Sequence, residues 1–169
     1  MKRLSTIVID KEYLKFSSAH FTVFSATERE RLHGHNFKVA ATFVAEVDDN
    51  GLCVDYSQLK KKVLELCESL DEYTLLPQYS PYLEIKEQDQ YYHVSFANET
   101  LLFLKADTLL LPIRNTTVED FSYYILQLIV SDSAFQQLCP IQQIDVWVSS
   151  GPGQNGMSSW KAADGIHVK

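Results

Sequence analysis

Three histidines have the residue type and the spacing to bind a metal ion together. His33 and His35 are one residue apart, and alternate side chains of a strand point to the same face, so both imidazoles can reach one cation. His20 ends a strand-like run upstream and supplies a third nitrogen. Three nitrogen ligands with a fourth position left open are typical of catalytic zinc rather than structural zinc.

The spacing alone leaves two interpretations open. A histidine is more often an ordinary core or surface residue than a ligand, and a His-x-His pair also arises by chance. Gly34, between the two histidines, has no side chain, which predicts a close approach of backbone or ligand at this position. A metal site is therefore a hypothesis that needs support from the rest of the chain.

The bulk composition is that of an ordinary soluble globular protein. The chain has 169 residues, of which 46% are hydrophobic and 22% charged, and this length suits a single domain over residues 1–169. The formal net charge of −7 argues against nucleic acid or a membrane as partner. A phosphorylated small molecule remains compatible, because it needs only a local basic patch.

Neither the cysteines nor the N-terminal residues indicate export. Cys53, Cys67 and Cys139 are odd in number and lack metal-knuckle or redox spacing, which predicts free thiols in a reducing compartment. The N-terminal apolar run stops at Asp10, too early for a signal-peptide core, and no stretch is long enough to span a bilayer. We therefore expect a cytoplasmic protein.

Hydrophobic periodicity predicts two long strands in the first part of the chain. Residues 6–20 are rich in β-branched and aromatic residues, and residues 36–47 alternate apolar with polar side chains. The charged segment between them, residues 21–31, is predicted to be a loop, and loops on a rigid sheet are where function concentrates.

Two amphipathic helices are predicted further on. After a turn at residues 48–51 and a short extended run at residues 52–54, Asp55 begins a helix. Thr116 and Glu119 form a capping box for the second helix. The apolar stripes of the two helices are Leu59, Val63, Leu66, Cys67 and Leu70, and Phe121, Ile125, Leu128 and Ile129.

The remaining segments are predicted to be strands. Residues 83–111 indicate a three-stranded meander between the helices, and two strands follow the second helix, the last running through Trp160. This order predicts an α+β fold, in which an antiparallel sheet carries both helices on one face together with an inserted β-meander.

Several of these segments resemble the 6-pyruvoyltetrahydropterin synthase and 6-carboxytetrahydropterin synthase family. The resemblance covers about Lys15 to Val148, with the segments in the family's order. They are Phe16-Ser17-Ser18-Ala19-His20, Leu32-His33-Gly34-His35-Asn36-Phe37, Gly51-Leu52-Cys53-Val54-Asp55-Tyr56, Leu70-Asp71 and Thr117-x-Glu119.

This resemblance implies a tunnelling fold (T-fold), in which subunits form trimers and two trimers pair into a homohexamer. It also implies active sites at subunit interfaces, with His20, His33 and His35 holding Zn2+. The implied ligand is a small reduced pterin, such as a pterin triphosphate.

The expected catalytic cysteine of the family is missing, because none of residues 28–31 is a thiol. Glu30 instead begins a Glu-x-x-His-Gly-His run, which resembles a branch whose glutamate replaces the cysteine. That branch cleaves dihydroneopterin triphosphate to 6-hydroxymethyl-dihydropterin for folate synthesis. Glu30 is thereby implied as the general base, and we expect partial burial to raise its pKa.

Two further departures fall on expected site residues. Glu72 stands where the family has a histidine that transfers protons together with the preceding aspartate, here Asp71; alternatively, both acids are a solvated pair at a helix end. Ser150 stands where the family has a pterin-binding glutamate, a change that costs about 2 kcal/mol of binding. Thr117 and Glu119 are expected to touch the pterin, to cap the helix, or both.

The resulting hypothesis is a zinc-dependent lyase that cleaves the side chain of 7,8-dihydroneopterin triphosphate, or of a related reduced pterin, by a retro-aldol reaction. One alternative is a family enzyme that eliminates triphosphate to give a 6-pyruvoyl- or 6-carboxy-tetrahydropterin, in folate or queuosine biosynthesis. The other is a non-catalytic metal- and pterin-binding relative, which Glu72 and Ser150 suggest.

Overall fold

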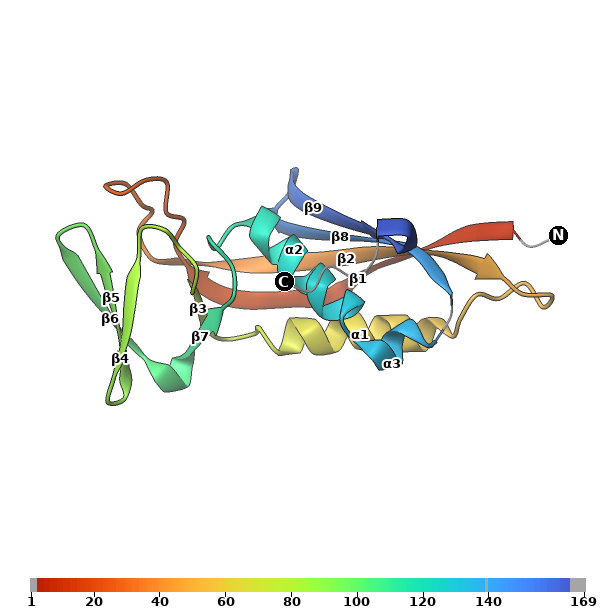
Figure 1. Cartoon of the computed structure of the whole chain (residues 1–169), viewed down its shortest axis with the longest axis horizontal. Helices are drawn as coiled ribbons and strands as arrows, with labels where there is room; N and C mark the ends of the chain where they lie inside the picture. The colour runs from red at the N-terminus through yellow and green to blue at the C-terminus, as the bar shows by residue number, and fades with distance from the viewer. Residues whose placement is uncertain (1–2, 139, 165–169) are drawn as a thin grey trace.

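A six-stranded sheet and a separate three-stranded sheet organise the chain (Figure 1). The structure, a computed structural model, describes residues 3–138 and 140–164. Its elements are β1 (Arg3–His20), β2 (His33–Val47), α1 (Tyr56–Glu68), β3 (Thr74–Pro77), β4 (Glu84–Gln88), β5 (Tyr91–Phe96), β6 (Glu99–Leu104), η1 (Lys105–Asp107), β7 (Thr108–Leu111), α2 (Val118–Val130), α3 (Ser133–Gln136), β8 (Ile141–Gly151), β9 (Gln154–Lys161) and η2 (Ala162–Asp164).

The six-stranded sheet has the order β7-β3-β1-β2-β8-β9 and is mixed rather than wholly antiparallel. Antiparallel pairing joins β1, β2, β8 and β9, as expected. At the other edge β3 pairs with β1 and with β7 in parallel. These two strands were not anticipated as part of this sheet, because four-residue strands are too short to show a hydrophobic period.

The inserted meander consists of β4, β5 and β6 and lies at the far end of the molecule from the start of β1 (Figure 1). It is shorter than residues 83–111, because β7 leaves the meander and joins the main sheet. One face of the insertion packs on the loop after β1 through a small apolar core of Phe21, Val23, Leu76, Val94, Phe96 and Phe103.

Both long helices pack in one hydrophobic core, which confirms the prediction that they share a face of the sheet. The alternating apolar side chains of β2, from Phe37 to Val47, are all buried, as the period predicted. Residues 52–54 form no strand, and they lead directly into the N-cap Asp55, whose side chain accepts from the backbone N–H of Ser57.

The N-cap of α2 is Thr117, and the predicted capping box of Thr116 with Glu119 is wrong by one residue. The Thr117 hydroxyl accepts from the backbone N–H of Asp120. Thr116 is fully buried and donates its hydroxyl to the carbonyl of Phe21. A tertiary hydrogen bond therefore takes the hydroxyl that the sequence pattern assigned to the cap.

Within the described residues, no helix combines the length and the apolar character needed to cross a membrane. Cys53 and Cys67 are free, as predicted, and burial raises the pKa of the Cys67 thiol to about 12. The third cysteine, Cys139, lies outside the described residues.

Candidate metal centre and active-site pocket

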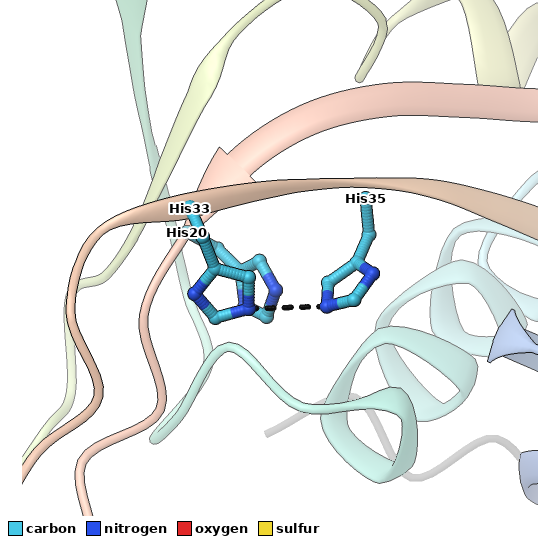
Figure 2. A group of neighbouring side chains, drawn as sticks. All are labelled: His20, His33 and His35. Carbon is cyan, nitrogen blue, oxygen red and sulfur yellow. Dashed lines mark hydrogen bonds between the residues drawn. The ribbon is translucent and has the colours of Figure 1, made fainter.

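The three histidines come together where β1 ends and β2 begins. His20 and His33 are register partners across the two strands, and His35 follows on the same face of β2. Figure 2 shows His33 and His35 projecting in the same direction from β2, with His20 beside them from β1. Their candidate ligand nitrogens all lie within 4.8 Å of one another, which is compatible with one shared cation.

Backbone carbonyls orient two of the three imidazoles. His20 Nδ1 donates to the carbonyl of Thr116 at 2.8 Å, and His33 Nδ1 donates to the carbonyl of Arg31 at 2.7 Å. Each bond places the proton on Nδ1 and leaves the lone pair on Nε2 free to bind a metal. Thr116 therefore has an orienting role that no local pattern in the sequence signals.

The ring nitrogens that are not bound to these carbonyls are better suited to coordinate a metal ion than to hydrogen-bond to one another. His20 Nε2 is buried and has no hydrogen-bond partner among the described residues, and a buried polar atom left unpaired is costly. His33 Nε2 lies 3.0 Å from His35 Nε2. Burial, opposed by the Thr116 bond, lowers the pKa of His20 to about 4, so this ring is neutral and able to coordinate at neutral pH.

Glu30 lies in the same pocket as the three histidines. The loop after β1 folds back on itself through a bridge between Val23 and Arg29. Glu30 then donates its N–H to the carbonyl of Thr22 at 2.8 Å, and its carboxylate accepts from the N–H of Thr22 at 2.9 Å. A segment predicted as an irregular loop is thus a compact hairpin that aims a carboxylate at the metal site.

The expectation of a raised pKa for Glu30 is wrong. Burial does raise the pKa of this carboxyl, but the hydrogen bonds from Thr22 and the charges of His33 and His20 together bring it below the ordinary value. Glu30 is therefore ionised at neutral pH, with a carboxylate available to accept a proton.

Thr117, Glu119 and Ser150 line the pocket, and their expected contact with a pterin stays a prediction. The first two belong to the N-terminal turn of α2, and Ser150 comes from the end of β8. Gln154, at the start of β9, also lines the pocket, although it was not among the site residues expected from the sequence. Its amide adds a donor and an acceptor beside the position where the family's carboxylate is missing.

Asp71 and Glu72 are not among the described residues that line this pocket. Asp71 Oδ1 accepts from the backbone N–H of Ser17 at 2.6 Å, and the N–H of Glu72 donates to the Ser17 carbonyl at 2.8 Å. Glu72 has a φ of 62°, in the left-handed region, and lines a second cleft together with Asn36. His35 also lines this second cleft, whereas His20, His33 and Glu30 line only the metal pocket.

The predicted close approach at Gly34 is not seen within the described chain. A Cβ atom built there would meet only the carbonyl oxygen of Ser18, at 3.7 Å, which is an ordinary contact. The position does not require glycine for its space.

Comparison with known proteins agrees with this geometry. The sequence model of the 6-pyruvoyl tetrahydropterin synthase family matches residues 9–152. The chain belongs to this family. It therefore has the T-fold that the resemblance implied, and the family to which it belongs consists of pterin-synthase-like enzymes.

Individual relatives span nearly the whole chain. A proposed 6-carboxy-5,6,7,8-tetrahydropterin synthase of Methanocaldococcus jannaschii is 30% identical over 142 residues, which cover 83% of this chain and 86% of that protein. The crystal structure of 6-pyruvoyl tetrahydropterin synthase from Plasmodium vivax is 29% identical, with a TM-score of 0.87, and covers 94% of this chain and 99% of its own. Two variants of the Plasmodium protein, with a catalytic glutamate replaced by alanine or cysteine, are 27% identical with the same TM-score and coverage.

Proposed function

We propose that this family member is a zinc-dependent lyase that cleaves the side chain of 7,8-dihydroneopterin triphosphate, or of a related reduced pterin, towards 6-hydroxymethyl-dihydropterin. The observation that carries this proposal is the Glu30 carboxylate in one pocket with His20, His33 and His35. The catalytic glutamate of the Plasmodium vivax relative supports an acidic residue in this role.

In this proposal the residues of the pocket divide the work between binding and proton transfer. His20, His33 and His35 hold the metal, which when bound supplies a positive charge that acidifies a substrate hydroxyl. Glu30, ionised at neutral pH, accepts the proton from the substrate side chain, which is the step that retro-aldol cleavage requires. Thr117 and Glu119 hold the pterin ring, with Ser150 offering a single weaker hydrogen bond.

Asp71 and Glu72 are proposed to act in the site of a neighbouring subunit. Neither acid lines the metal pocket of its own chain, and Glu72 instead lines a neighbouring cleft that shares only His35 with that pocket, which supports this arrangement. The six-stranded sheet ends in β7 and β9, each paired on one side only within the described residues, so both edges are available for strand pairing. A cytoplasmic homohexamer built as a dimer of trimers, with sites at subunit interfaces, is the proposed assembly.

A second candidate function is elimination of triphosphate to give a 6-pyruvoyl- or 6-carboxy-tetrahydropterin. The Methanocaldococcus jannaschii relative favours it, since that protein carries the name of a carboxy-pterin synthase. A third candidate, a pterin-binding relative without turnover, is favoured by Glu72 and Ser150, which replace functional residues of the family.

Incubation of the zinc-loaded protein with dihydroneopterin triphosphate, followed by identification of the released pterin, tests the three candidates. We expect 6-hydroxymethyl-dihydropterin and the cleaved phosphorylated fragment. A pyruvoyl or carboxy pterin would establish the second candidate. Tight zinc and pterin binding without any product would establish the third.

A further inference from the structure

Arg29, next to Glu30, connects the inserted meander to the loop of the metal pocket. Its Nε and Nη2 both donate to Glu99 Oε2, at 3.0 and 2.5 Å, and its Nη1 donates to the backbone carbonyl of Glu30 at 2.9 Å. The Arg29 side chain is only 16% exposed, although it is charged and belongs to a loop. A mostly covered cation with a hydrogen bond from each of its three nitrogens indicates a structural role that a surface charge does not have.

Aromatic rings from both sides also contact the Arg29 guanidinium. Its Cζ lies 5.3 Å from the ring centroid of Phe21 and 5.7 Å from that of Phe96. Phe21 directly follows the metal ligand His20, whereas Phe96 ends β5 and Glu99 begins β6. Residues on both sides of the β5–β6 turn therefore contact the Arg29 guanidinium. Phe96 contacts it through its ring, and one carboxylate oxygen of Glu99 accepts two of its hydrogen bonds. Lysine cannot reproduce this combination.

The contact with Glu30 falls on its backbone, which leaves its carboxylate free to face the pocket. The N–H of Glu30 is held by the carbonyl of Thr22, and its carbonyl is held by Arg29. Both peptide groups that flank the Glu30 side chain are thus fixed, one by the hairpin itself and one through the insertion. Without Arg29, the second of these restraints is lost.

We infer that Arg29 is a positioning residue, which ties the β5–β6 turn of the insertion to the backbone of Glu30 and so holds the Glu30 carboxylate beside the metal pocket. The inference rests on the proposed function, in which Glu30 accepts the proton. It assigns the meander a task in catalysis, although none of its strands lines the pocket among the described residues. Displacing a reacting group by about 1 Å costs up to about 100-fold in rate, so a modest loosening is measurable.

The variant Arg29→Met tests this inference, because methionine keeps an unbranched apolar stem between the two rings but removes every hydrogen bond. With dihydroneopterin triphosphate and zinc-loaded protein, we expect kcat to fall about tenfold while KM changes by less than about twofold. Zinc content should be unchanged. Amide hydrogen exchange in residues 22–31 should become faster, because the hydrogen bond from Arg29 to the Glu30 carbonyl no longer restrains the loop.

A second variant, Glu99→Gln, removes only the charge of the partner. We expect a smaller decrease in kcat, about threefold, and a smaller acceleration of exchange, because Glu99 is 57% exposed and its ion pair is partly screened. If Arg29→Met does not fold, Glu99→Gln still tests the inference, because it leaves Arg29 and its ring contacts in place.

The matched control is Lys105→Met within the same insertion. Lys105 pairs with Glu87 at 2.9 Å and lies 5.6 Å from the Tyr92 ring, an ion pair and ring contact like those of Arg29. Both of these contacts stay within the insertion and neither involves residues 22–31, so kcat and exchange in residues 22–31 should equal those of the wild type.

Three results would overturn the inference: full kcat in Arg29→Met, unchanged exchange in residues 22–31, or an equal loss of kcat in Lys105→Met. Glu30→Gln, measured in the same assay, separates this failure from failure of the proposed function. If Glu30→Gln is inactive and Arg29→Met is fully active, only the positioning role is wrong. If Glu30→Gln is fully active, the proposed role of Glu30 is wrong and the inference falls with it.

Discussion

At the scale of single residues, the pocket depends on which nitrogen of each histidine carries its proton. Backbone carbonyls of Thr116 and Arg31 fix His20 and His33 with Nε2 free, and the unpartnered His20 Nε2 is the atom most in need of a ligand. Glu30 differs from the histidines in that hydrogen bonds from Thr22 keep it charged. The pocket thus places the neutral His20 ring and the ionised Glu30 carboxylate together.

Removal of one ligand should release the metal without unfolding the protein. We expect wild-type protein to bind about one zinc ion per chain and His33→Ala to bind it at least about tenfold more weakly. His33 lies outside the hydrophobic core, so the circular dichroism spectrum should be unchanged. Elemental analysis after dialysis measures the zinc, and full zinc retention in His33→Ala would contradict the assignment.

Glu30→Gln should remove turnover while the metal stays bound. The amide has nearly the shape of the carboxylate but cannot accept a proton, and loss of a general base costs about 100- to 10,000-fold in rate. Steady-state kinetics and zinc analysis of the same preparation check this prediction. Wild-type kcat in this variant would exclude Glu30 from proton transfer.

At the scale of elements, β9 sets the position of the helix end that lines the pocket. A Cβ atom at Gly156 would lie 2.5 Å from the backbone of Val118 and 2.6 Å from the backbone nitrogen of Glu119. These are backbone atoms and cannot simply rotate away. The glycine therefore permits the close packing of β9 against the first turn of α2.

Gly156→Ala should push the first turn of α2 away from β9. We expect a loss of about 1–3 kcal/mol in the free energy of unfolding, together with weaker pterin binding, because Glu119 moves with the turn. Gly151→Ala is the control, since no described atom lies within 4 Å of a Cβ built there and its φ is ordinary. Denaturant titration and pterin binding check the pair, and equal stability of both variants would contradict the packing argument.

A buried carboxylate joins β2 to β8 and should make stability depend on pH. Asp145 accepts from Thr42 at 2.9 Å and from Gln143. Burial raises the pKa of Asp145, but hydrogen bonds from Ser159, Gln143 and Thr42 bring it below the ordinary 3.8. Because the folded pKa is the lower one, the stabilisation is present above pH 3.8 and is lost as the pH falls through the folded value.

Asp145→Asn should therefore be less stable than the wild type at neutral pH, by about 1–2 kcal/mol. The difference between the two proteins should shrink as the pH is lowered below 3.8. Denaturant titrations of both proteins at several pH values measure it. A difference that stays constant down to the lowest pH would contradict the role of the charge.

At the scale of the whole molecule, the two groups of proposed catalytic residues line two different clefts of one chain, which have only His35 in common. The metal pocket holds Glu30, and the other cleft holds Glu72, with Asp71 bound to Ser17 beside it. Under the proposed function, a complete site needs two copies of the chain, which makes assembly a condition for activity.

Mixing two inactive variants tests the shared site. Glu30→Gln and Asp71→Asn should each be inactive alone, whereas co-expressed chains should recover about a quarter of wild-type activity, because random pairing leaves that share of sites with both residues. Analytical ultracentrifugation should give the mass of a hexamer. An inactive mixture of correctly assembled chains would contradict sites shared between subunits.

The sequence by itself determined the periodic features of this protein. Alternation along a strand requires His33 and His35 to share a face and buries every second side chain from Phe37 to Val47, because a period of two follows from the backbone alone. The family motifs likewise located Thr117, Glu119 and Ser150, which the structure brings into one pocket.

Only the tertiary structure decided the contacts between segments far apart in the chain. Four features depend on partners outside the local pattern. They are the parallel pairing of β3, the hydrogen bond from Thr116 to Phe21, the ion pair of Arg29 with Glu99, and the lowered pKa of Glu30. Hydrogen bonds form only between groups in direct contact, and the attraction between charges weakens as their distance grows. Their partners are therefore known only when the fold has brought them together.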